Sequence, residues 1–304
     1  MPNFELDRRH EIGFLTEGRE FNPLNRLRDP SVNPDVYDRS TSAGRGPCVA
    51  VAARSGPRRN VGTAQCRYRR RSCRPYSVCT DQAGTRPSVL ILHGTNGFEL
   101  KPSAYEHYAH ALTAKGIDAY WVRYLSEADV SSFKTTRERR EAYENRRFDD
   151  WAKKISSVVT TILARPDSAG RIGLLGFSLG GYVAADTAAR DERITALAVM
   201  YGGMPDAMVS EVKHLPPLIE LHGEADRNVP PAKGEELVKL AKAIGVEAEF
   251  VGYPGKPHGF DFSDNDPATA DALTRVVGFF EARLVTASPT PAPGSPHTPP
   301  TAQP

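Results

Sequence analysis

The chain has 304 residues, 25% of them charged, and a formal net charge of +2. This length suits one large α/β domain with extensions, or two small domains, and the small net charge says little about the partners of the whole chain. No run of about 18 apolar residues occurs, so the sequence predicts no membrane-spanning helix.

Residues 1–84 differ in composition from the rest of the chain and are predicted to form an irregular extension. Between Arg45 and Arg86 every basic residue is arginine, and Asp81 is the only acidic one. The same stretch holds all the cysteines: Cys48, Cys66, Cys73 and Cys79. Their spacing fits no zinc template and no histidine is near, while two disulfides are an option for an exported protein.

Three interpretations of this arginine-rich stretch stay open. Its runs, such as Arg69-Arg70-Arg71, suit a patch for nucleic acid or another anionic surface, a disordered basic segment, or a stretch translated in a shifted frame. The segment Met1 to Asp7 has neither the basic start nor the apolar core of a signal peptide, so we expect a cytoplasmic protein.

From Arg86 onward, apolar strands alternate with amphipathic helices, which predicts an α/β domain over residues 85–285 with a mostly parallel sheet covered by helices on both faces. Ser103 is the expected N-cap of the first helix. The polar stretch Ser126–Arg147 is predicted to be a surface excursion, and the Pro- and Thr-rich tail 286–304 to be disordered. The predicted strands are 86–94, 117–124, 172–175, 194–201, 218–223 and 246–253, and the predicted helices are 101–116, 149–164, one from Leu179 to about Arg190, 235–244 and 266–284.

The stretch Gly176-Phe177-Ser178-Leu179-Gly180 stands between a predicted strand and a predicted helix. A serine raised above a sheet on such a sharp turn needs strained backbone angles, and small residues two positions away let the strand and the helix approach each other. The pattern alone is weak, and an incidental serine in a glycine-rich turn is the alternative. Its position between strand and helix favours a nucleophile.

A serine nucleophile needs a base, and the base needs a third group that orients it. Asp226 and His258 each follow a later predicted strand, so the chain order is Ser178, Asp226, His258. The carboxyl ends of parallel strands are where such sites gather. Asp226 alone also suits a loop turn, Glu224 competes for its role, and His258 alone suits an ordinary loop histidine. Three compatible residues at three strand ends favour a catalytic triad.

These residues lie in motifs that, from about Thr85 to Leu284, resemble the dienelactone hydrolase-like branch of the α/β-hydrolase superfamily. The motifs are Leu92-His93-Gly94-Thr95, Gly176-Phe177-Ser178-Leu179-Gly180-Gly181, His222-Gly223-Glu224-Ala225-Asp226-Arg227-Asn228-Val229-Pro230 and Pro257-His258-Gly259-Phe260. The resemblance implies the α/β-hydrolase fold, with Ser178 as nucleophile, His258 as base and Asp226 as its orienter. It also implies an oxyanion hole formed by the backbone N–H groups of Thr95 and Leu179.

The chain departs from dienelactone hydrolase proper at two positions of the site. That enzyme has a cysteine nucleophile and a glutamate just after the first strand of the motif set, where this chain has Ser178 and Gly94. These differences argue against dienelactone itself as the substrate. His93 and His222, which also follow strands, are interpreted as structural hydrogen-bonding residues.

The sequence therefore predicts a serine hydrolase that cleaves a carboxylic ester or related acyl substrate through an acyl-enzyme. A thioesterase or peptidase on the same fold is one alternative, and an inactive binding protein that uses the basic N-terminal segment is the other. No metal, cofactor, membrane or nucleic-acid partner is indicated, and the oligomeric state is undetermined. The arginines of Ser126–Arg147 suit a solvated charged face or an overhang above the pocket that favours anionic groups. They are Arg137, Arg139, Arg140, Arg146 and Arg147.

Overall fold

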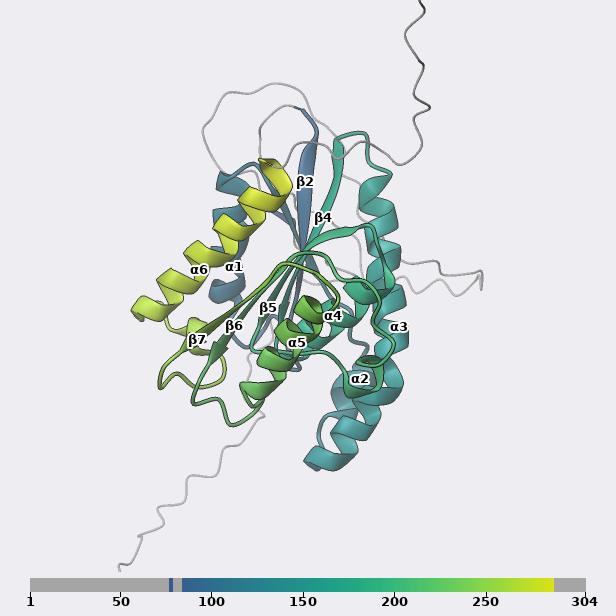
Figure 1. Ribbon diagram of the computed structural model, residues 1–304, viewed down its shortest axis with the longest axis vertical. Coiled ribbons are helices and arrows are strands. Elements are labelled where there is room, and N and C mark those ends of the chain that lie inside the picture. The colour runs from purple at the N-terminus through teal and green to yellow at the C-terminus, as the bar shows by residue number, and fades with distance from the viewer. Residues whose placement is uncertain (1–76, 79–83, 287–304) are drawn as a thin grey trace, which may run out of the picture. The chain divides into compact units, whose positions relative to one another are not determined.

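The computed structural model describes residues 77–78 and 84–286 (Figure 1). The predictions of an irregular extension and of a disordered tail therefore fall almost wholly on residues outside the described part of the chain. In that part, no helix combines the length and the apolar character that crossing a bilayer requires.

A seven-stranded sheet with the order β1-β3-β2-β4-β5-β6-β7 forms the centre of the described domain. The short strand β1 pairs antiparallel with β3, and every other neighbouring pair is parallel. Parallel strands buried on both faces are mostly apolar, as the buried segments of β2, β4 and β5 are. The strands are β1 Ser77–Val78, β2 Arg86–Leu92, β3 Asp118–Val122, β4 Ser168–Phe177, β5 Ile194–Met200, β6 Leu218–Gly223 and β7 Ala248–Tyr253.

Helices cover both faces of this sheet (Figure 1). On one face lie α1 (Pro102–Ala114) and α6 (Pro267–Phe280), and on the other lie α3 (Arg137–Leu163), α4 (Leu179–Arg190) and α5 (Ala232–Ala243). The shorter elements are α2 Glu127–Ser132, the 3₁₀ turns η1 Asp206–Met208 and η2 Phe260–Phe262, and the π-helical turn η3 Glu281–Val285.

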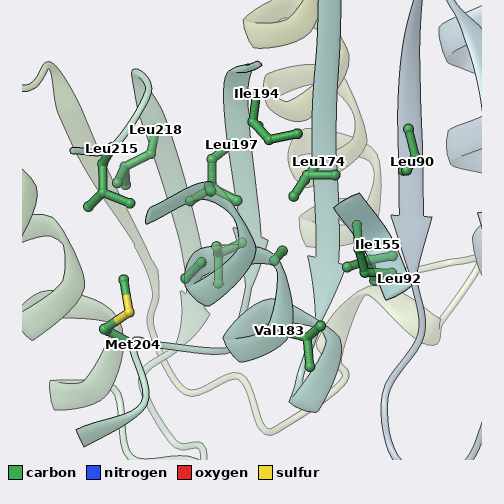
Figure 2. Packing of buried hydrophobic residues seen from close by; sticks show 14 of the residues in the cluster. Leu90, Leu92, Ile155, Leu174, Val183, Ile194, Leu197, Met204, Leu215 and Leu218 are labelled. Carbon is green, nitrogen blue, oxygen red and sulfur yellow. The ribbon is translucent and has the colours of Figure 1, made fainter. Parts of the chain in front are cut away.

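Alternate residues of the strands build two separate cores, because successive side chains of a strand point to opposite faces. Leu90 of β2 and Leu174 of β4 pack with Ile155 of α3 and Val183 of α4, as Figure 2 shows. The next residue of β2, Ile91, belongs to the core under α1 and α6 instead. This arrangement confirms the predicted fold class, with the carboxyl ends of the parallel strands at one edge of the sheet.

The stretch Ser126–Arg147 lies mostly at the surface, as predicted, but the prediction missed its helices, since it contains α2 and the first eleven residues of α3. The predicted helix 149–164 is the apolar end of a helix that begins at Arg137. Its first turns carry no apolar stripe and are supported by ion pairs one turn apart, Arg137 with Glu141 and Arg140 with Glu144. Such pairs stabilise a helix that hydrophobic periodicity does not detect.

A smaller correction concerns the start of α1. Ser103 is not its N-cap, because the helix begins at Pro102 and Lys101 holds the cap position without a side-chain hydrogen bond. Proline at the first position supplies a backbone angle already suited to a helix, which replaces the serine cap.

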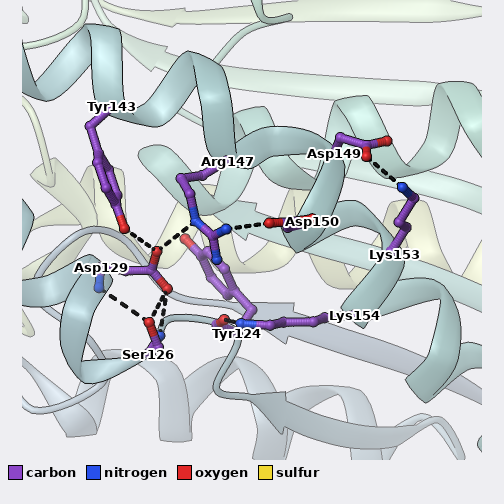
Figure 3. A network of polar contacts seen from close by, with 9 residues as sticks. All are labelled: Tyr124, Ser126, Asp129, Tyr143, Arg147, Asp149, Asp150, Lys153 and Lys154. Atoms are coloured by element: carbon purple, nitrogen blue, oxygen red, sulfur yellow. Dashed lines mark hydrogen bonds and ion pairs between the residues drawn. The ribbon is translucent and has the colours of Figure 1, made fainter.

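A buried carboxylate, Asp129, holds α2 against α3 (Figure 3). It accepts hydrogen bonds from Ser126, from the Tyr143 hydroxyl at 2.8 Å and from Arg147 Nε at 3.0 Å. Burial by itself would raise the pKa of Asp129, but these hydrogen bonds outweigh it and hold the pKa well below its usual range. The network thus fixes the first turns of α3, which border the cavity described next.

Candidate active site

Ser178 occupies the sharp turn between the end of β4 and the start of α4. Its φ of 54° and ψ of −121° are strained for a residue with a side chain. The turn needs glycine on both sides: a Cβ on Gly176 would lie 2.2 Å from the Gly180 carbonyl oxygen, and one on Gly180 would lie 2.4 Å from that of Leu92. Strand β2, strand β4 and helix α4 therefore approach closely beneath the serine.

The structure brings the three predicted residues Ser178, Asp226 and His258 into one hydrogen-bonded chain. His258 Nε2 lies 2.9 Å from Ser178 Oγ, and His258 Nδ1 lies 2.6 Å from Asp226 Oδ2. Asp226 belongs to the loop after β6, and His258 to the loop after β7. Glu224, the competing carboxylate, is exposed and its carboxyl group lies against Gly252 instead.

The Asp226 side chain is buried and its second oxygen is also occupied. Oδ1 accepts the backbone N–H groups of Asn228 at 2.8 Å and Val229 at 2.9 Å. Burial alone would raise the pKa of Asp226, but hydrogen bonds from His222, His258 and Val229 hold that pKa well below its usual range. The carboxylate is therefore ionised at neutral pH and keeps the proton of His258 on Nδ1, which leaves Nε2 free to accept one from serine.

A second histidine behind Asp226 extends this chain inward. His222 Nε2 lies 3.0 Å from the Val229 carbonyl oxygen and 3.4 Å from Asp226 Oδ2, and Nδ1 lies 2.8 Å from Glu220 Oε1. Burial opposes protonation of His222, yet Asp226 and Glu220 raise its pKa to about 10. Burial raises the pKa of Glu220 as well, while the hydrogen bond with His222 opposes this rise.

The sequence interpretation of His222 as a structural hydrogen-bonding residue missed this contact with Asp226. A signal was present: Glu220 is a carboxylate in the middle of the otherwise apolar strand β6. A buried acid two residues before a buried histidine lies on the same face of a strand, where a polar pair is required. His93, by contrast, makes the local hydrogen bond expected of it, to the Gly94 carbonyl oxygen at 2.7 Å.

Thr95 and Leu179 both line the cavity that Ser178 also lines. Thr95 lies shortly after the carboxyl end of β2, and Leu179 is the first residue of α4. Among the described residues neither amide N–H has a hydrogen-bond acceptor. Two unused donors beside a hydroxyl group, one of them at the positive end of a helix, can donate hydrogen bonds to an oxygen that develops negative charge.

A cavity of about 700 Å³ opens at Ser178 and His258. Its wall combines aromatic rings, such as Tyr105 and Phe177, with charged side chains from the first turns of α3. Arg137 and Arg140 belong to this wall, each beside a glutamate partner one turn later on the same helix. Arg139, Arg146 and Arg147 do not line the cavity.

Over residues 77–78 and 84–286, no group of three or more histidine, cysteine, aspartate or glutamate side chains is arranged to hold a metal ion.

Comparison with solved structures shows the same fold in several hydrolases. The dienelactone hydrolase from Anabaena variabilis matches with a TM-score of 0.56 at 21% identity, over 69% of this chain and 91% of that one. Esterase PE8 matches with a TM-score of 0.55 at 15% identity, over 68% and 97%. The acylaminoacyl peptidase from Pyrococcus horikoshii matches with 0.53 at 15% identity, over 71% of this chain but only 40% of its own.

No curated protein matches the chain at a significant level. The model of the dienelactone hydrolase family, however, matches residues 74–284, which is more than half of the chain. The matched residues include all seven strands of the sheet as well as Ser178, Asp226 and His258. The chain belongs to the dienelactone hydrolase family and is a hydrolase of the α/β-hydrolase type.

Proposed function

We propose that the protein cleaves a carboxylic ester through a covalent acyl-enzyme on Ser178, with His258 as general base and acid and Asp226 as the residue that orients it. The observation that carries the proposal is the continuous chain of contacts, 2.9 Å from Ser178 Oγ to His258 Nε2 and 2.6 Å from His258 Nδ1 to Asp226 Oδ2. Both distances are short enough for their roles in the free enzyme: His258 can accept the proton of Ser178, and Asp226 can orient the imidazole ring.

In the first half of the reaction, Ser178 Oγ attacks the acyl carbon while its proton passes to His258 Nε2. The carbonyl π bond becomes an oxyanion, which accepts hydrogen bonds from the amides of Thr95 and Leu179. When the tetrahedral intermediate collapses, the bond to the leaving group breaks and the proton on His258 moves to the departing alkoxide. The products of this half are a free alcohol and an ester of Ser178.

In the second half, water replaces the alcohol. His258 Nε2 removes a proton from the water as its oxygen attacks the acyl carbon, and the same proton then returns to Ser178 Oγ when the acyl bond breaks. Asp226 remains ionised throughout, because its pKa is held well below neutrality. The carboxylic acid leaves and the free enzyme is regenerated.

The leaving group decides between an esterase and its close alternatives, a thioesterase and a peptidase. An ester is favoured because the chain is similar to an esterase over nearly the whole length of that enzyme, whereas the similar acylaminoacyl peptidase is covered over 40% of its length. The cavity, with its volume of about 700 Å³, suits a small acyl substrate.

The test compares the wild type with Ser178→Ala on matched p-nitrophenyl ester, thioester and p-nitroanilide substrates of the same acyl group. We expect ester hydrolysis to be fastest and to fall by about 10⁴-fold or more in Ser178→Ala, with an unchanged circular dichroism spectrum. Ser210→Ala, which alters an exposed serine away from the cavity, should keep full activity. Equal hydrolysis by the wild type and Ser178→Ala would refute the proposal, and faster thioester or anilide cleavage would identify an alternative.

A further inference from the structure

Asp261 is a second carboxylate near the proposed base, and it is almost completely buried, with 1% of its surface exposed. It lies in η2, three residues after His258. Each of its oxygens accepts one tyrosine hydroxyl: Oδ1 from Tyr201 at 2.9 Å and Oδ2 from Tyr108 at 3.1 Å. These two hydroxyl groups and the backbone N–H of Asp261 itself satisfy its hydrogen-bonding capacity only in part, since a carboxylate has about four acceptor positions.

No resident cation compensates the charge of Asp261. In the described part of the chain, no lysine, arginine or histidine forms an ion pair with it. Burial raises the pKa of Asp261 to about 6, although the tyrosine hydrogen bonds, a hydrogen bond from its own backbone N–H and the nearby His258 oppose this rise. A buried carboxylate that is ionised at neutral pH without a cation reduces stability, and such a group is retained where it has a function.

Tyr201 connects Asp261 to His258. Its ring lies edge-on to the His258 imidazole, with 4.7 Å between the centroids and an interplanar angle of 62°. Apart from Ser178, it is the only non-glycine residue of the described chain with a positive φ, 42°, a strained angle that occurs mostly at functional sites. Its amide donates to the Leu221 carbonyl oxygen at 2.8 Å, which fixes the residue at the carboxyl end of β5.

We propose that Asp261 is a positioning residue for the acyl-transfer reaction: through Tyr201 it fixes the His258 ring, and its uncompensated charge stabilises the imidazolium that forms when His258 takes the Ser178 proton. Asp226 provides the orienting hydrogen bond on one side of the ring, and Asp261 acts through Tyr201 on another. The inference rests on the proposed role of His258 as base.

Few titratable groups face Asp261 and His258, and these groups set the pH dependence of the proposed interaction. Facing Asp261 are Tyr108 and Tyr105 from α1, Tyr201 after β5 and His258 before η2. Facing His258 are Ser178, Asp226, Tyr201 and Asp261. All the tyrosines stay neutral in the working range, because burial raises the pKa of each one above its ordinary value.

The test measures the second-order rate of Ser178 labelling by a fluorophosphonate between pH 4.5 and 9 in the wild type, Asp261→Asn and Asp264→Asn. Asparagine has the same shape as aspartate and can still accept a tyrosine hydroxyl. Asp264 is an exposed carboxylate three residues further along, which makes it the matched control. The positive charge on His258 is no longer stabilised in Asp261→Asn, so we expect the plateau rate to fall by about tenfold and the acidic limb of the profile to move to lower pH.

Asp264→Asn should reproduce the wild-type profile. If Asp261 were only structural, its asparagine variant would melt at a different temperature while the folded fraction kept the wild-type limb and plateau, and this result would overturn the inference. Absence of labelling in the wild type would instead refute the proposed function itself, so the two failures are distinguishable.

Discussion

His258 Nδ1 lies 2.6 Å from Asp226 Oδ2, although the two residues follow different strands and are 32 positions apart in the sequence. Adjacent parallel pairing of β6 and β7 brings their carboxyl ends together, so the loops that follow them meet above the same edge of the sheet. Ser178 arrives at this edge from β4 by the same rule. The site is thus a consequence of strand order, and each of its members can be tested separately.

Asp226→Asn should lower kcat/KM for an ester by about 10²- to 10⁴-fold, because an amide nitrogen facing His258 Nδ1 favours the wrong tautomer of the imidazole. The asparagine oxygen can still accept the amides of Asn228 and Val229, which should preserve the loop. Steady-state kinetics measures the effect, with exposed Glu224→Gln as the control. A loss in Glu224→Gln comparable to that in Asp226→Asn would contradict the assignment of the carboxylate.

Gly176→Ala should destabilise the protein by at least about 3 kcal/mol, since the added methyl group would meet the Gly180 carbonyl oxygen at 2.2 Å and backbone atoms cannot move aside cheaply. The matched variant is Gly278→Ala in α6, where nothing lies within 4 Å of the new methyl group. That change should stabilise the helix by about 0.5–1 kcal/mol. Urea unfolding of both variants provides the comparison, and a neutral Gly176→Ala would show that the turn is not tightly packed.

Arg147→Met should destabilise the protein by about 2–4 kcal/mol, because the buried carboxylate of Asp129 loses its only cationic partner among the described residues. Arg139→Met changes an exposed residue of the same helix, so it should have little effect. The melting temperatures should differ by roughly 5–15 °C between the two variants, given about 2–4 °C for each kcal/mol. Equal melting temperatures would mean that Asp129 contributes nothing to holding α2 on α3.

Asp261 should make the wild type less stable as the pH rises, and Asp261→Asn should lack this effect. The folded-state pKa of about 6 is higher than the unfolded value near 3.8, so between these values the folded state binds the proton more tightly. The stability of the wild type relative to the variant should thus decrease as pH rises from about 4 to 6, by up to about 3 kcal/mol. Unfolding by urea at several pH values measures this difference in stability. A difference that stays constant with pH would show that Asp261 does not have a raised pKa in the folded protein.

Much of the fold is predictable from the sequence, because parallel strands and their covering helices carry strong hydrophobic patterns. The runs around Leu90, Leu174 and Leu197 identify three central strands, and each lies in the observed core. The first turns of α3 are not predictable in this way. They are helical because of charge pairs such as Arg137 with Glu141 and contacts of Asp129 with Arg147, and neither leaves an apolar period in the sequence.

The candidate site also has one part that is predictable from the sequence and one part that is not. Ser178, Asp226 and His258 stand in short motifs with recognisable spacing, so the amino-acid sequence is sufficient to select them as candidates. The residues behind them cannot be selected in this way, because their partners are distant in sequence. Asp261 meets Tyr108 across 153 positions and Tyr201 across 60. Only the packing of α1 and β5 around η2 brings these side chains together.

The most direct test of the proposed function is to treat the purified protein with a fluorophosphonate probe and to map the adduct by mass spectrometry, with His258→Ala as the control. The account predicts one adduct, on Ser178, that forms in the wild type and drops by at least about 10³-fold in rate in the control, because the serine loses its base. A folded wild type that stays unlabelled, or one labelled equally well without His258, would contradict it.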